Sequence, residues 1–86
     1  MKLFKISQDE DDGYDTYDSA VVVAENEDDT RKIHPDGYTK DVSKWSGSPS
    51  SRTWATDPSK VSVEYIGEAC ESITEEMVVV ASFNAG

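Results

Sequence analysis

The side chains that could perform chemistry in this chain are eighteen carboxylates, one histidine and one cysteine. A nucleophilic pair would join Cys70 to His34, but Cys70 follows no basic segment or helix start that would lower its pKa. A single histidine and a single cysteine, without paired ligand spacing, argue against a zinc site. Phosphate-binding, nucleophile-elbow and zinc-protease motifs are absent from the sequence. We therefore expect a protein that is not an enzyme and has no cofactor.

The carboxylates are concentrated between residues 9 and 29, a stretch without Lys or Arg. So much like charge costs stability through self-repulsion, although the resulting field attracts basic surfaces. Direct binding of nucleic acid is not expected, because Lys and Arg supply most of that affinity and the net charge is −10. The ten carboxylates of this stretch are Asp9, Glu10, Asp11, Asp12, Asp15, Asp18, Glu25, Glu27, Asp28 and Asp29.

The first of these acidic segments, residues 9–18, invites comparison with a calcium-binding loop. If Gly13 is taken as the invariant glycine of an EF-hand, Gln8 occupies the first ligand position and Ser19 the last. Neither residue supplies the carboxylate that the position requires, so the segment is not an EF-hand and we expect no metal. A solvated acidic loop, loose cation binding and a negative recognition surface all remain open as interpretations.

Two aromatic pairs are candidates for contact with a partner. Tyr14 and Tyr17 lie among the acids, and tyrosine is enriched at protein interfaces, although one of them could instead pack over a sheet edge. Trp45 and Trp54 lie in a polar segment with three bases. Aromatic and basic residues in combination are also typical of sites that bind single-stranded nucleic acid. Because the whole chain is acidic, we expect Trp54 to pack before a strand and Trp45 to be the exposed contact. The three bases are Lys40, Lys44 and Arg52.

Four strands are expected to position these residues, at residues 2–7, 19–25, 60–67 and 76–83. The second and fourth are apolar on both faces, which is typical of central strands, whereas the first and third alternate and should be edges.

A short helix is expected between the second and third strands. Asn26 is a good N-cap, acids occupy the first turn, bases and His34 follow, and Pro35 ends the helix. His34 should then hydrogen-bond terminal carbonyls of that helix. The polar segment 36–59 is unusually long for a loop. The 86 residues form one domain of the α+β class, with the order β-β-α-β-β and a four-stranded, mainly antiparallel sheet.

The segments MKLFKISQ, YDSAVVVAENEDDTRKIHPDG, WATDPSKVSVEYIGEA and VVVASFNAG resemble a group of short proteins encoded by phages and prophages. The resemblance covers most of the chain and includes no catalytic motif. It implies a small accessory protein acting inside a bacterial host, a setting in which small acidic proteins block host defence or regulatory proteins. An anti-CRISPR protein, or another protein that imitates the charge of DNA, would be one instance.

We therefore expect a non-catalytic inhibitor whose acidic face engages a basic, nucleic-acid-binding surface of a host protein. The alternative is a structural or assembly protein that associates through sheet edges or the tryptophan-containing loop. The lone cysteine, the lack of a signal peptide and the lack of a long apolar run predict a cytoplasmic location without membrane contact. The expected partner-binding residues are Asp9, Glu10, Asp11, Asp12, Tyr14, Asp15, Tyr17, Asp18, Glu27, Asp28, Asp29 and Trp45.

Overall fold

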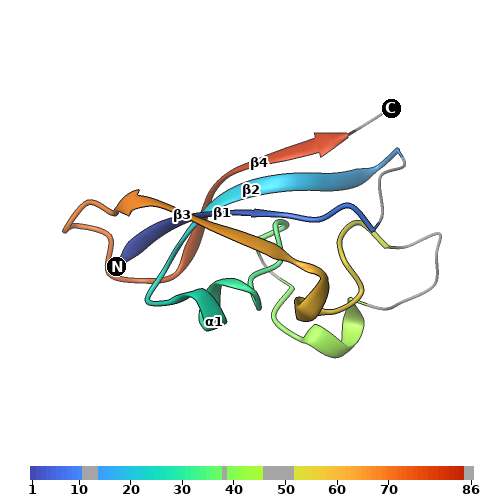
Figure 1. Cartoon of the computed structure of the whole chain (residues 1–86), viewed down its shortest axis with the longest axis horizontal. Coiled ribbons are helices and arrows are strands. Elements are labelled where there is room, and N and C mark those ends of the chain that lie inside the picture. Colours follow the sequence, from blue (N-terminus) through green and yellow to red (C-terminus); the bar gives the residue numbers. More distant parts are fainter. Residues whose placement is uncertain (11–13, 38, 46–51, 85–86) are drawn as a thin grey trace.

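The computed structural model describes residues 1–10, 14–37, 39–45 and 52–84. In this part of the chain, four antiparallel strands form one sheet, and a short helix with two 3-10 turns lies against one face of it (Figure 1). The predicted α+β class is confirmed. The elements are β1 (Lys2–Ser7), β2 (Thr16–Ala24), α1 (Glu27–Thr30), 3-10 turns at Val42–Lys44 and Pro58–Lys60, β3 (Ser62–Glu68) and β4 (Met77–Asn84).

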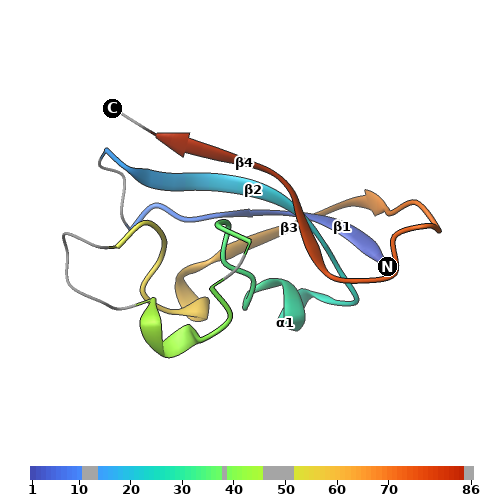
Figure 2. The same cartoon turned by 180° about the vertical axis from the view of Figure 1, so that it is seen from behind.

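The strand order is β3-β1-β2-β4, so β1 and β2 are central and β3 and β4 are the edges. The predicted edge position of the first strand and the predicted central position of the fourth were both wrong. The hairpin places β2 beside β1, and β3 returns to the other side of β1, so the free side of β2 is left for β4. As a result β4 is apolar on both faces yet largely exposed. Figure 2 shows β4 at the margin of the sheet.

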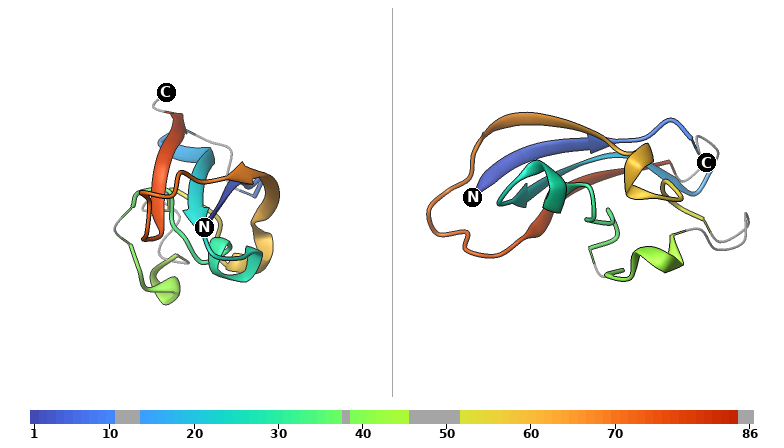
Figure 3. Two further views of the ribbon diagram at one scale, coloured as in Figure 1. Left: turned by 90° about the vertical axis from the view of Figure 1, so that its left-hand side faces the viewer. Right: turned by 60° about the horizontal axis from the view of Figure 1, so that its bottom comes forward.

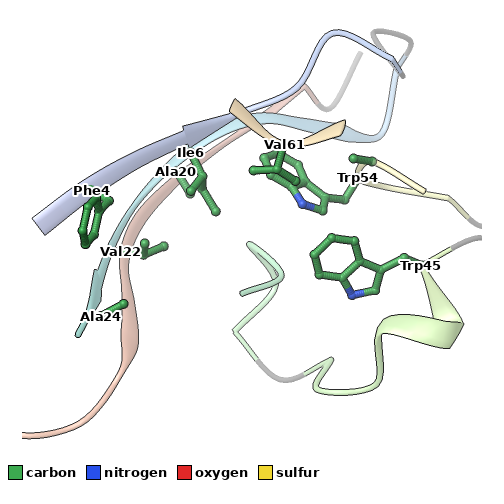
Figure 4. Close-up of a cluster of buried hydrophobic side chains, with 9 residues drawn as sticks. Phe4, Ile6, Ala20, Val22, Ala24, Trp45, Trp54 and Val61 are labelled. Carbon is green, nitrogen blue, oxygen red and sulfur yellow. The ribbon is translucent and has the colours of Figure 1, made fainter. Parts of the chain in front are cut away.

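The core lies between the sheet and the segments that cover one face of it, seen as two layers in the right-hand view of Figure 3. Trp54 is the largest fully buried side chain and retains 1% of its exposure. Trp45 retains 3%, so the prediction that it is an exposed partner contact was wrong, whereas the predicted packing of Trp54 is confirmed. Both indoles point toward the strands (Figure 4). They close a core whose other buried members are Phe4, Ile6, Ala20, Val22, Ala24, Ala55 and Val61.

The helix α1 begins where the sequence predicts but ends earlier. The side chain of Asn26 accepts a hydrogen bond from the backbone N–H of Asp29 at 2.8 Å. Thr30 is fully buried, and after Arg31 the chain tightens into turns in which the N–H groups of Lys32 and Ile33 reach back only three residues. This tightening carries His34 into the core, so its predicted place at the helix end, bonding terminal carbonyls, was wrong.

Replacing Asn26 by alanine is expected to lower the free energy of unfolding by about 1 kcal/mol, because an N-cap acceptor is lost. Urea denaturation of the two proteins measures the difference. Asn26→Ser is the matched control, since serine keeps the acceptor and should lose clearly less. Equal losses in both variants would contradict the capping role.

Candidate binding surfaces

The hairpin loop between β1 and β2 carries the first group of candidate acids. Asp9 and Asp15 are exposed there, and Asp18 is exposed near the start of β2, whereas Asp11 and Asp12 lie outside the described residues. Asp15 has a φ of +60°, a left-handed backbone conformation that Asp and Asn tolerate better than most residues. We call the group Asp9, Glu10, Asp15 and Asp18 the loop acids.

Glu10 is the loop acid that contacts a distant segment of the chain. Its carboxylate accepts hydrogen bonds from the backbone N–H of Thr56 at 2.8 Å and from the Thr56 hydroxyl at 2.9 Å. These bonds, helped by Lys60 and Arg52, hold the pKa of Glu10 below its ordinary value of 4.5. Glu10 therefore ties the hairpin loop to the segment before β3.

The two candidate tyrosines have different environments. Tyr14 is 77% exposed and is available to a partner. Tyr17 is half-buried, and its ring lies edge-on to Phe83 at 4.8 Å and to His34 at 6.1 Å. Tyr17 therefore packs across the β2–β4 pair and contributes chiefly to the core, as the alternative interpretation of one tyrosine allowed.

The acids of α1 do not adjoin the loop acids. Glu27, Asp28 and Asp29 follow the end of β2, whereas the loop acids precede or surround its start. Nine extended residues span about 26 Å at the usual rise per residue. The single acidic stretch of the sequence thus becomes two groups at opposite ends of the sheet.

At the far end of the sheet, the α1 acids meet acids from another part of the chain. Lys2, the first residue of β1, is paired with Ala24 on one side and with Glu68 on the other, and Val23 is paired with Met77. The end of β2, the end of β3 and the start of β4 therefore lie at the same end of the sheet. We call this group the acidic end: Glu25, Glu27, Asp28, Asp29, Glu68, Glu71, Glu75 and Glu76.

Two other members of this group, Asp29 and Glu25, lie close enough to Glu76 to affect its pKa. Its pKa is raised above 4.5, first by burial and then by the negative charges of Asp29 and Glu25, while Lys40 offsets part of the effect. A carboxylate in this condition is destabilised by its neighbours and would gain from a cation. This proximity could not be predicted from local patterns, because residues 25–29 and 75–76 are far apart in the chain.

Ion pairing neutralises little of this charge in the described part of the chain. Glu27 pairs with Arg31 at 2.8 Å, and Arg31 also donates to the carbonyl of Val61. Asp36 lies 3.3 Å from the His34 imidazole. Lys2, Lys32 and Lys40 also lie at this end of the molecule, so the acidic end remains negative, with eight acids against four bases including Arg31.

His34 and Cys70, the candidate nucleophilic pair, have different neighbours. His34 is buried, with its ring 5.7 Å from that of Trp45, and its Nδ1 accepts a hydrogen bond from the backbone N–H of Asp36 at 3.1 Å. Cys70 is exposed, and its sulfur lies 3.2 Å from the Ser72 hydroxyl, which lowers the pKa of the thiol. The described contacts therefore do not assemble a cysteine–histidine pair.

A hollow of about 420 Å³ lies between the segment after α1 and the start of β4. Its wall mixes apolar side chains with charges of both signs, and neither its position nor its lining could be predicted from sequence patterns. The residues around it are Asp29, Lys32, Ile33, His34, Gly37, Thr39, Lys40, Glu76, Met77 and Val78.

Across the described ranges, no group of three or more His, Cys, Asp or Glu side chains is arranged to hold a metal ion. A search of the helices in the same ranges finds none with the length and apolar content needed to span a membrane. Comparison of the chain with known protein families, with curated proteins and with solved structures finds no match.

The burial of His34 predicts a pH dependence of stability. Burial lowers its pKa below 6.5, and this effect outweighs the opposing influence of Asp36. The unfolded chain therefore binds a proton before the folded chain does, so stability should fall as the pH drops below about 6.5, by at most about 1.4 kcal/mol per pH unit.

Urea denaturation between pH 7.5 and 5.5 measures this effect. The raised pKa of Glu76 acts in the opposite direction at the lower end of that range, so Glu76→Gln is the appropriate background. Adding His34→Gln should flatten the dependence. A dependence that persists after that substitution would contradict the assignment.

Proposed function

We propose that this protein is a non-catalytic inhibitor or binding protein of the phage type, acting in the bacterial cytoplasm, whose acidic surface engages a basic, nucleic-acid-binding surface of a host protein. The observation that carries the proposal is the gathering of acids at one end of the sheet, where β4 starts beside the end of β2 and where Asp29 and Glu25 contribute to the raised pKa of Glu76. A positively charged partner would offset the charge of these acids, which is the condition for favourable electrostatic association.

The positions of the two acidic groups fit an extended basic groove on the partner better than a single small contact. The loop acids and the acidic end are separated by about the length of β2, roughly 26 Å. A duplex carries phosphate charge continuously along its axis, and a basic groove that binds it offers positive charge over a comparable length. A protein that is negative at both ends can therefore occupy such a groove in the way that an anti-CRISPR protein or another DNA mimic would.

Capture from bacterial lysate tests the proposal. The immobilised protein should retain basic, nucleic-acid-binding proteins at low salt and release them at high salt. A variant with Asp9, Asp15, Glu71 and Glu75 replaced by their amides is the control, and it should retain much less of the same proteins. Capture that is equally strong with the variant, or insensitive to salt, would refute the electrostatic function.

An assembly protein is the second candidate, and the exposed outer strand β4 favours it. Val79 is 49% exposed and Val80 is 60% exposed on a strand that has no described neighbour on its outer side. Trp45 and Trp54 are buried in the core, so the sheet edge is the surface that supports this candidate. Sedimentation separates the two functions, since assembly requires association that depends on protein concentration.

A further inference from the structure

The two edges of the sheet are built differently. The outer strand β3 carries Glu64 and Glu68 and includes Gly67, features that discourage pairing with another chain. The outer strand β4, with the sequence MVVVASFN, has neither a charge nor a proline. Because register shifts occur in the pairings of both strands, charge rather than bulges distinguishes the two edges.

The length and composition of β4 suit the addition of a further strand. It has eight residues, more than the usual five or six, and it is rich in the β-branched residue valine. Met77, Val79, Val80 and Phe83 are all between 44% and 60% exposed. A long, uncharged edge strand with an exposed backbone is a template for an incoming extended segment.

Carboxylates lie at both ends of this edge. Glu75 and Glu76 precede β4, with Asp29 and Glu25 near Glu76. At the other end, the backbone N–H of Asp15 donates to the carbonyl of Asn84, the last residue of β4. The edge is therefore an apolar strand of eight residues between two negative groups.

This charge pattern decides what the edge would accept. A symmetric pair of copies would align β4 antiparallel to itself. Glu75 and Glu76 of one copy would then approach Asp15 of the other, and like charges brought together oppose association. A segment with an apolar middle and basic ends has the complementary pattern.

We propose that the outer edge of β4 pairs with an extended segment of a partner protein that is apolar in its middle and basic at both ends. This inference rests on the proposed function and specifies how the basic partner is held. The hollow beside Met77 and Val78 adjoins the start of the edge and offers room for one side chain of the added strand. In strand addition, backbone hydrogen bonds supply affinity, and such pockets supply specificity.

Two synthetic peptides test the inference. Both alternate valine and threonine, one with lysines at each end and the other with glutamates. The lysine peptide should slow hydrogen exchange at β4 amides and leave those of β3 unchanged. The glutamate peptide should bind at least about tenfold more weakly, as expected for like-charge contact.

Val80→Lys is the diagnostic variant, and Ile66→Lys is its matched control on the other edge strand, where Ile66 is 46% exposed. Both side chains are exposed, so neither change should disturb the core. Val80→Lys should lower the affinity for the lysine peptide about tenfold, because it places a charge on the docking edge. Ile66→Lys should leave that affinity unchanged.

Protection of β3 amides, equal effects of the two variants, or a dimer that Val80→Lys dissociates would overturn the inference. If the amide substitutions weaken binding of the captured partner but Val80→Lys does not, the inferred strand pairing is wrong while the electrostatic function stands. If the two peptides bind β4 equally, charge has no part in recognition at this edge and the inferred partner chemistry is wrong, whereas salt-insensitive capture would refute the proposed function itself.

Discussion

Replacing Trp54 by alanine should lower the free energy of unfolding by about 3–5 kcal/mol, the usual range when a large buried aromatic side chain is removed. Domains of this size are only marginally stable, often near the lower end of about 5–15 kcal/mol, so most of the protein's stability would be lost. Urea denaturation followed by circular dichroism measures the change. A loss below about 1 kcal/mol would contradict the position of Trp54 in the core.

Trp54→Phe tests whether packing of the ring accounts for the stability that Trp54→Ala removes. The Nε1 atom of Trp54 is buried and has no hydrogen-bond partner among the described residues, so phenylalanine removes an unsatisfied donor while it keeps most of the ring. Its cost should be clearly smaller than that of alanine. A cost equal to that of alanine would show that the indole is held by interactions other than packing.

Replacing Asp9, Asp11, Asp12 and Asp15 by asparagine should slow association with a captured partner by about one to two orders of magnitude at low salt, since electrostatic steering raises association rates on this scale. The dependence of the rate on salt should also flatten. Stopped-flow association at several salt concentrations provides both quantities. An unchanged association rate would contradict steering by these four carboxylates.

A matched set at the acidic end identifies which group faces the partner. Glu25→Gln, Asp28→Asn, Glu71→Gln and Glu75→Gln remove the same number of charges from exposed side chains. If both groups line one groove, the two sets should slow association to similar extents. If only one set has an effect, the partner contacts a single end, and the proposed spanning of a groove is wrong.

The sequence predicted the local elements well, because each depends on neighbouring residues. Alternation and valine content identify the strands, and Asn26 followed by acids identifies the start of α1. The strand order could not be obtained in this way. An apolar pattern on both faces usually indicates a central strand, but β4 shows it at an edge.

The candidate site was predicted only in part for the same reason. Tyr14 and the described loop acids are exposed, as a recognition surface requires, whereas Trp45 is buried because the loop that carries it folds over the sheet. The acidic end depends on β4 starting beside the end of β2. That contact follows from tertiary pairing, which the charges of the sequence alone do not encode.

The most direct test is competition between this protein and nucleic acid for the captured partner. Binding of a labelled duplex to the partner is measured while the protein is added, at low and at high salt. We expect that the protein displaces the duplex, that displacement weakens as salt rises, and that the variant with Asp9, Asp11, Asp12 and Asp15 replaced by asparagine displaces it poorly. A ternary complex in which the partner holds the protein and the duplex together would contradict this expectation.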